Sequence, residues 1–467
     1  MTSAPELPVR LWQAALALAA LGTGVLAGVA PVRSAILAVA LAIAVVALSD
    51  LTLGVCIFAF VAFLDYYYPN VFTLFGLLLG VSWLAAVTAG GRRGREFLST
   101  HPAATWLVAL LPAWAAMSLL WAESSPPVTN AIVKYAVNGA LFLIVYTAVR
   151  TRRQVVLVLG AFVLSAAFSA AYGLLVPAES TGYGELERLS GPIGDPNALA
   201  RLLVPGLVVA AVLAGLDSLS SPKRMLATGA AVLCGVGLVL TFSRGGLFAL
   251  VGALAIALFF AGRWRAQVGV LVVGVALLAG GYYAASPEAR DRLTNVDGGS
   301  GRTDLWRVGW EMAQDRPLLG VGAGNFGEVS PRYLGEAGLL RRSDLIVSTP
   351  NVLHNTYLGT LVELGVVGAG LWLALLGFSL ACLVRAARTS MRANDAGMEL
   401  LARGLFVALI GMLAADFFIS EPYNKHLWLL LALAPAVLAV ARSRSVAETR
   451  TPATKVTSGP RPVAGVS

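Results

Sequence analysis

The chain has 467 residues, of which 58% are hydrophobic and 13% are charged, and its mean hydropathy is +0.78. Soluble domains contain roughly 25% charged residues, so this composition excludes a soluble globular protein and indicates a polytopic membrane protein. The net charge of +9 would suggest a nucleic-acid partner in a soluble domain. Here the basic residues lie in connections between apolar runs, so we interpret them as topology signals and expect the lipid bilayer, and no nucleic acid, as a partner.

Long apolar runs recur along the chain from Leu11 to Val440. A helix needs roughly 20 apolar residues to cross a hydrocarbon core of about 30 Å. The runs that we expect to span the membrane are 11–30, 34–49, 51–64, 71–89, 104–121, 129–149, 154–176, 197–216, 225–241, 246–262, 266–285, 355–383, 400–419 and 426–441. The predicted fold class is all-α, with about 12–14 transmembrane helices and one long loop.

Basic residues concentrate in every second connection between these runs. They are Arg92, Arg93, Arg95, Arg150, Arg152, Arg153, Lys223, Arg224, Arg263, Arg265, Arg385, Arg388, Arg392, Arg442 and Arg444. The positive-inside rule places such connections in the cytoplasm. We therefore predict that both termini are cytoplasmic and that the long loop lies outside.

Four regions follow from this topology. They are an N-terminal transmembrane bundle at 1–285, an extracytoplasmic loop with short helices at 286–354, C-terminal transmembrane helices at 355–441, and a cytoplasmic tail at 442–467. The tail is rich in Thr, Ser, Pro and Gly and has no apolar period, which predicts disorder.

The long loop is too long to be a passive turn between packed helices. Its segment Thr303 to Asp315 has a helical pattern, with Trp306 and Trp310 one turn apart and Pro317 ending the run. Such a pair of tryptophans lies along the membrane surface or caps a cavity. The two tryptophans could either anchor the segment in the aromatic belt of the membrane or stack on a sugar, and the sequence leaves both roles open.

A glycine-rich run follows, from Gly320 to Phe326. It has no preceding strand, so a tight turn is favoured over a nucleotide-binding loop. The acidic residues of the outer loops show no paired spacing, and the cysteines Cys56, Cys234 and Cys382 lie inside apolar runs. We expect no metal site and no cofactor.

Several ionisable residues lie inside predicted spans, where they are costly and usually face a polar cavity. They are Lys134, Arg201, Arg244, Glu363 and Asp416. All five map to the outer half or the middle of their helices, which predicts a polar site near the outer face. Asn197 lies one turn before Arg201, so both are expected on one helical face.

Three arginines are candidates for binding one anion: Arg201, Arg244 and Arg302 from the loop. Arginine suits this task because its planar guanidinium gives bidentate hydrogen bonds to phosphate oxygens and stays charged. The alternatives are that Arg244 extends to the interface or pairs with Asp416, and that Arg302 is a solvated loop residue.

His354 stands at the start of a predicted helix, where the positive end of the helix dipole disfavours protonation. A neutral imidazole there can accept a proton from a hydroxyl nucleophile. A structural role is the alternative. For the other two histidines, His101 and His426, we expect structural roles.

Five short motifs occur in one order along residues 190–370. They are Gly194-Asp195-Pro196-Asn197, Phe242-Ser243-Arg244-Gly245-Gly246, Gly301-Arg302-Thr303-Asp304-Leu305-Trp306, Pro317-Leu318-Leu319-Gly320-Val321-Gly322, and His354-Asn355-Thr356-Tyr357 through Glu363-Leu364-Gly365. In this order they resemble the O-antigen ligase and polymerase superfamily.

The resemblance implies a metal-independent glycosyltransferase of cell-envelope polysaccharide biosynthesis, located in the bacterial cytoplasmic membrane with its site on the outer face. The donor would be a glycan on undecaprenyl pyrophosphate, and the acceptor a hydroxyl of a glycan, lipid or protein. By motif, Arg244 and Arg302 would bind the pyrophosphate and His354 would activate the acceptor. We expect supporting roles for Asn197, Asn355, Glu363, Asp416 and Lys134.

Three other functions remain open at this point. A repeat-unit polymerase and a protein O-glycosyltransferase share the motifs and differ in the acceptor. A membrane transporter also places charges within the membrane. Against a transporter, the sequence has no visible internal repeat, and its intramembrane charges gather toward one face.

Overall fold

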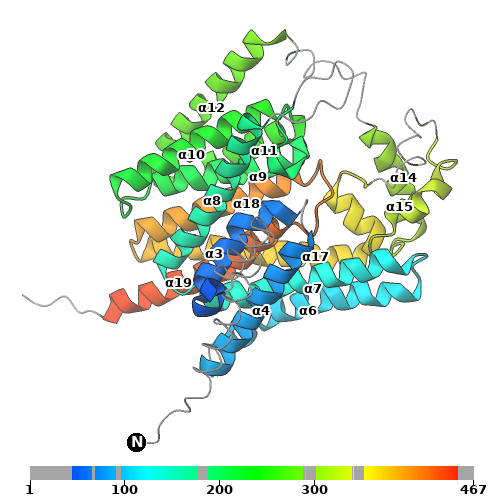
Figure 1. The fold of residues 1–467 in the computed structure, drawn as a ribbon, viewed down its shortest axis with the longest axis horizontal. Coiled ribbons are helices and arrows are strands. Elements are labelled where there is room, and N and C mark those ends of the chain that lie inside the picture. The colour runs from blue at the N-terminus through cyan, green and yellow to red at the C-terminus, as the bar shows by residue number, and fades with distance from the viewer. Residues whose placement is uncertain are drawn as a thin grey trace, which may run out of the picture.

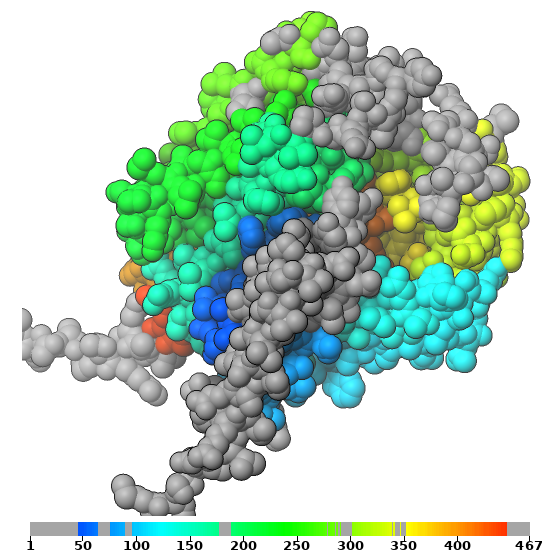
Figure 2. All heavy atoms as spheres, in the orientation of Figure 1, coloured from blue at the N-terminus to red at the C-terminus, as the bar shows by residue number. Residues whose placement is uncertain are grey.

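We describe a computed structural model of the chain (Figures 1 and 2). It describes residues 45–65, 69–90, 96–176, 188–287, 301–338 and 352–450, together with positions 290, 340 and 346. The first predicted span, 11–30, most of the second, and the chain beyond 450 lie outside the described residues. Every statement below about the fold concerns the described part.

Helices make up this part of the chain, and it contains no β-strand. The longer ones are α3 (Leu51–Val61), α4 (Pro69–Gly90), α6 (Pro102–Met117), α7 (Ser125–Ala148), α8 (Arg152–Leu175), α9 (Pro196–Ala214), α10 (Ser221–Leu240), α11 (Arg244–Phe260), α12 (Arg265–Ala285), α14 (Arg302–Asp315), α17 (Thr356–Arg392), α18 (Ala396–Ala415) and α19 (Lys425–Arg450). Short helices are α5 (Glu96–Thr100) and α15 (Phe326–Val329), with 3₁₀ turns between several elements.

The described helices form a polytopic membrane protein. Nine of them are long and apolar enough to cross a bilayer, and Leu51–Val61, Phe75–Thr88 and Arg244–Phe260 are shorter apolar helices. Each predicted span from 51–64 onward coincides with a helix. The predicted all-α membrane fold is therefore confirmed.

The bundle is centred on α9, α18 and α19, whose apolar side chains are mostly buried. Helix α9 packs against α8, α10 and α18, while α17 packs against α6, α18 and α19 (Figure 1). At the periphery, α12 leaves its apolar stretch exposed, as a lipid-facing helix does. The end of the bundle beside α14 is called the loop end below.

At the opposite end, arginines meet acidic residues of α18 and its preceding turn. Glu399 pairs with Arg263 and Arg403, and Asp395 pairs with Arg152 and Arg444. These pairs connect α8, α18, α19 and the turn before α12. The sequence predicted a disordered tail from residue 442, because the tail lacks an apolar period. Helix α19 instead continues to Arg450, so residues 442–450 are helical.

The helix predicted in the long loop is present as α14, which begins at Arg302 and ends at Asp315. It builds a small apolar core with the following turns and with α17. The buried members of this core are Leu305, Val308, Met312, Ala313, Val321, Phe326, Val329, Tyr333, Ile346, Leu353 and Val362. The described part of the loop is therefore a packed layer on the loop end of the bundle.

Helix α17 is broken at Gly365, which has φ 64° and ψ −175°. The segment Pro317 to Gly320 enters this break. The amide of Val366 donates a hydrogen bond to the carbonyl of Pro317 at 2.8 Å. A Cβ at Gly365 would lie 2.1 Å from the carbonyl oxygen of Leu318. Only glycine fits this conformation and this close approach.

The glycine-rich run predicted as a tight turn continues along the broken helix. The amide of Val321 donates to the carbonyl of Val362, and the amide of Gly322 donates to that of Glu363, both at 2.9 Å. Gly320, Gly322 and Gly324 all have positive φ. The turn therefore replaces hydrogen bonds that the break in α17 removes, and it fixes the position of Glu363.

We expect Gly365→Ala to destabilise the protein. The backbone conformation alone costs a non-glycine residue about 1–3 kcal/mol, and the contact with Leu318 adds to this. Thermal unfolding in detergent should show a lower midpoint than for Gly377→Ala, a control in the same helix where an added Cβ meets no atom within 4 Å. Equal midpoints for the two variants would contradict this account of the break.

Candidate active site

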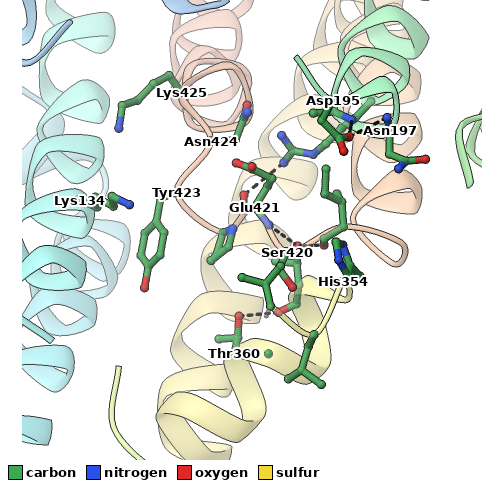
Figure 3. Close-up of a pocket in the computed structure, with 18 of the residues that line it drawn as sticks. Lys134, Asp195, Asn197, His354, Thr360, Ser420, Glu421, Tyr423, Asn424 and Lys425 are labelled. Carbon is green, nitrogen blue, oxygen red and sulfur yellow. Dashed lines mark hydrogen bonds between the residues drawn. The ribbon is translucent and has the colours of Figure 1, made fainter. Parts of the chain in front are cut away.

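A cavity of about 850 Å³ opens at the loop end (Figure 3). Its walls come from α7, α9, the first turns of α17, the turn at 324–328 and the connection between α18 and α19. Its ionisable lining residues are Lys134, Asp195, Arg201, Glu328, His354, Glu363, Glu421, Tyr423, Lys425 and His426. A cavity of this size suits a ligand of a few rings.

His354 lines this cavity from the segment that leads into α17. Its backbone has φ 51°, a left-handed conformation that is uncommon outside glycine and that concentrates at functional sites. The preceding carbonyl, of Leu353, accepts a hydrogen bond from Trp306 Nε1 at 2.9 Å. Trp306 is thus a structural anchor for the histidine, whereas Trp310 is exposed.

The residues after His354 hold this segment in place. Asn355 caps α17: its Oδ1 accepts hydrogen bonds from the amides of Tyr357 at 3.1 Å and Leu358 at 3.0 Å. The amide of Thr356 donates to the carbonyl of Asp416 at 2.9 Å. Asn355, for which a supporting role was predicted, is thus the N-cap of α17 and is not among the residues that line the cavity.

The environment of His354 favours the neutral imidazole. Burial lowers the pKa of His354, the positive charge of Arg302 lowers it further, and Asp195 acts in the opposite direction. The imidazole makes no hydrogen bond to another described residue. At neutral pH the ring can therefore accept a proton from a bound hydroxyl group.

This predicts the pH dependence of a reaction that needs neutral His354. The rate should fall at acidic pH as the imidazole becomes protonated, with an apparent pKa below the ordinary value of 6.5. Arg302→Gln removes a positive charge beside the ring and should move this limb of the profile toward higher pH. If the acidic limb of the pH–rate profile lies at the same pH in Arg302→Gln as in the wild type, the charge of Arg302 does not act on His354.

Two arginines lie near His354, although neither is among the residues that line the cavity: Arg302 acts on His354, and Arg244 acts on Arg302. Arg302 is the first residue of α14 and Arg244 the first residue of α11. Burial lowers the pKa of the Arg302 guanidinium, Asp195 opposes this shift, and Arg244 adds to it. Neither guanidinium has an ion pair or hydrogen bond to another described residue. Asp195 is near enough to act on Arg302, but neither arginine forms an ion pair with a described carboxylate, and two neighbouring half-buried cations of this kind favour a bound anion.

Hydrogen bonds between two of the sequence motifs position Arg244. Asn197 Oδ1 accepts from Ser243 Oγ at 2.9 Å, and Ser243 Oγ in turn accepts from the amide of Gly246 at 3.1 Å, capping α11. Asp195 caps α9 by accepting from the amides of Asn197 and Ala198. The supporting role predicted for Asn197 is consistent with this geometry, since it joins the starts of α9 and α11.

Arg201 differs from the other two arginines. It is buried and forms an ion pair with Asp416, the residue that ends α18. A further nitrogen, Nη2, donates to the carbonyl of Glu421 at 3.4 Å. Asp416 therefore pairs with Arg201, and the alternative pairing of Asp416 with Arg244 is wrong. Arg201 lines the cavity, but its charge is already balanced.

Glu363 and Lys134 line the part of the cavity nearest α7. The carboxylate of Glu363 accepts a hydrogen bond from the amide of Gly324 at 2.9 Å. The ammonium group of Lys134 lies 5.3 Å from the ring centre of Tyr423, within the range of a cation–π contact. The ring of Tyr423 also meets Tyr135 edge to face.

Some lining residues were not among the predicted site residues. His426, for which a structural role was predicted, lines the cavity, lies 3.3 Å from Ser165 Oγ and packs on Phe162. Tyr423 and Lys425 also line it. All three belong to the connection before α19 or its first turn. Their signal was present in the sequence as a short polar connection on the predicted outer side, the same side as the long loop.

The fold and this cavity define a multi-pass membrane protein with a polar site at one end of its helix bundle. Residues 229–373 match a family model described as O-Antigen ligase. This match supports the O-antigen ligase superfamily, as the ordered motifs indicated, and together with the membrane helices it supports a membrane protein of polysaccharide biosynthesis. The matched segment contains Arg244, Arg302, His354 and Glu363. No curated protein matches the chain.

Proposed function

We propose that the protein transfers a glycan from undecaprenyl pyrophosphate to an acceptor hydroxyl. The family match supports glycosyl transfer in polysaccharide biosynthesis, and the two arginines near His354 support the particular donor. The observation that carries the proposal is a pair of neighbouring arginines that form no ion pair with a described residue: Arg302, which acts on the half-buried His354, and Arg244, which acts on Arg302.

The arginines act on the leaving group. In the donor, the anomeric carbon of the glycan is bonded through oxygen to the pyrophosphate. As this bond breaks, the electron pair stays on the pyrophosphate oxygen, and the guanidinium groups of Arg244 and Arg302 stabilise the added negative charge. Both are held on helix N-termini, so little reorganisation is needed when the charge develops.

His354 acts on the nucleophile. The acceptor oxygen forms a bond to the anomeric carbon, and the proton of the acceptor hydroxyl moves to the neutral imidazole. The products are the glycosylated acceptor, lipid pyrophosphate and a protonated His354, which then releases its proton to solvent. The lowered pKa of His354 favours this release.

The location of the reaction follows from the topology that the arginine distribution predicts. If the arginine-rich end faces the cytoplasm, the loop end faces outward, where undecaprenyl-pyrophosphate glycans are used. We therefore assign the protein to the bacterial cytoplasmic membrane, with both termini cytoplasmic and the cavity on the outer face. Labelling of Glu336→Cys in intact cells with an impermeant reagent tests this assignment.

Release of lipid pyrophosphate from an undecaprenyl-pyrophosphate oligosaccharide by the purified protein tests the function. We expect Arg244→Ala to lower the rate by about 10²–10³-fold, the usual effect of removing one group that stabilises transition-state charge. Arg224→Ala is the matched control, because Arg224 lies at the far end of the preceding helix, beside Asp217. It should keep the wild-type rate.

Two results would contradict the proposal. The first is full activity of purified Arg244→Ala. The second is an absence of release by the wild-type protein across a panel of glycans with polysaccharide, lipid and protein acceptors, and this result would favour transport. If a second molecule of the donor serves as acceptor, the products lengthen by whole repeat units, and the protein is a polymerase.

A further inference from the structure

The cavity has two ends with different side chains. Figure 3 shows His354, Asp195 and Asn197 together on one side, and Lys134, Tyr423 and Lys425 on the other, with Glu421 and Ser420 between them. The first group comes from α9 and the start of α17. The second comes from α7 and the connection before α19. We call them the His354 end and the Lys134 end.

The two arginines lie near the His354 end, although neither lines the cavity. The charges of Arg302 and Asp195 act on His354, and that of Arg244 acts on Arg302. Arg244 begins α11, and Figure 1 shows α11 and α7 on opposite sides of the bundle. An anion held by these arginines would therefore lie on the far side of His354 from Lys134.

Displacement at the anomeric carbon sets where the acceptor approaches. The incoming oxygen approaches roughly opposite the bond that breaks, and its proton must reach the base. If the leaving pyrophosphate lies at the arginines, the acceptor oxygen approaches from the Lys134 side of His354. The Lys134 end is therefore available for the rest of the acceptor.

The side chains at the Lys134 end suit a glycan. Lys134 supplies hydrogen-bond donors, the carboxylate of Glu363 supplies acceptors, and the amide of Asn424 supplies both. The aromatic ring of Tyr423 offers an apolar face of the kind that packs on the C–H groups of a sugar ring. Glu363 already accepts from the amide of Gly324, and Asn424 Oδ1 accepts from the amide of Leu427. A lipid chain would still leave the ammonium group of Lys134 and the side-chain NH₂ of Asn424 without an acceptor, and the surface of a folded protein is too broad for a cavity of about 850 Å³.

We propose that the Lys134 end, formed by Lys134, Glu363, Tyr423 and Asn424, is the acceptor subsite, and that it binds the hydroxyl-bearing end of a glycan chain. This inference rests on the proposed transfer from a lipid pyrophosphate. It goes further by assigning the class of acceptor and the residues that select it.

Cysteine protection separates the two ends. Ser420 lies between the two ends, but its Oγ accepts a hydrogen bond from the amide of Asn355, the residue after His354, at 3.2 Å. Ser420→Cys therefore reports on the side of the cavity next to His354, and Lys134→Cys reports on the Lys134 end, each labelled with a water-soluble thiol reagent in detergent. Lys223→Cys, exposed at the start of α10, is the control. Labelling of the wild-type cysteines Cys56, Cys234 and Cys382, which lie in apolar helices, gives the background.

We expect undecaprenyl pyrophosphate without a glycan to slow labelling of Ser420→Cys and to leave Lys134→Cys unchanged. A polysaccharide that the wild-type protein glycosylates should slow labelling of Lys134→Cys. Protection of Lys134→Cys by the glycan-bearing donor alone would overturn the inference, because that end would then hold the donor glycan. Protection by a protein acceptor and by no polysaccharide would overturn the assignment of a glycan.

Kinetics provide a second test that does not depend on labelling. Lys134→Gln keeps a side chain of similar length without its charge. We expect the acceptor KM to rise about tenfold or more, as for loss of a charge-assisted hydrogen bond, with a much smaller change in the donor KM. Equal changes in the acceptor KM and the donor KM would overturn the assignment of the Lys134 end as the acceptor subsite. A wild-type protein that neither binds nor cleaves the lipid pyrophosphate contradicts the proposed function itself, and the inference with it.

Discussion

Replacing His354 with alanine is expected to lower kcat for glycan transfer by about 10²–10⁴-fold, the range contributed by a general base. Binding of the lipid pyrophosphate should be much less affected, because Arg244 and Arg302 remain in place. Single-turnover release of lipid pyrophosphate at saturating donor measures the chemical step. Partial recovery of the rate by added imidazole would identify the missing group as a proton acceptor.

A matched control is His101→Ala. His101 is also a histidine next to a helix, but its ring packs between Phe97 and Tyr146 away from the cavity. This variant should keep most of the activity per folded molecule. Wild-type kcat in purified His354→Ala would remove His354 from the mechanism and leave its left-handed backbone conformation as a structural feature only.

The second large effect is expected on stability, at the ion pair of Arg201 and Asp416. Asp416→Ala leaves the buried guanidinium without its carboxylate, and breaking a buried pair in this way costs about 3–5 kcal/mol. The double variant Arg201→Met with Asp416→Ala carries no unpaired charge. We expect it to be more stable than Asp416→Ala alone, as measured by reversible unfolding in mixed detergent micelles.

The outcome separates two roles for Arg201. If the arginine serves the fold, the double variant recovers stability, and the loss of activity follows the loss of folded protein. If Arg201 binds the pyrophosphate directly, as its inclusion among the anion-binding arginines predicted, Arg201→Met should raise the donor KM of the folded fraction. If the double variant is no more stable than Asp416→Ala, the unpaired charge of Arg201 is not what destabilises Asp416→Ala.

The sequence predicted the membrane fold well because the signals are local. Each span from residue 51 onward is a continuous apolar run, and the apolar length that crosses a bilayer is a physical constant of the bilayer. Helix α14 was also predicted, from the spacing of its tryptophans and from Pro317 beyond its end. Neither prediction needed knowledge of which helices are neighbours.

The site was predicted only in part, because its contacts join residues far apart in the chain. The partner of Asp416 is Arg201 and not Arg244, a choice made by the packing of α9 on α18. His426 was expected to be structural, and its burial against Ser165 and Phe162 fits that role, but it also lines the cavity, because the connection before α19 hydrogen-bonds to Thr356 at the start of α17. Neither the choice of partner nor this chain reversal leaves a local pattern in the sequence.

The contacts between the glycine turn and the two halves of α17 are made by main-chain atoms: the amides of Val321, Gly322 and Val366 all bond to carbonyl oxygens. Such joints depend on backbone shape and on a few glycines, and they do not depend on which side chains surround them. Substitutions of cavity-lining side chains are therefore expected to leave these main-chain bonds intact. The frame that holds the site and the side chains that fill it can then vary independently of each other.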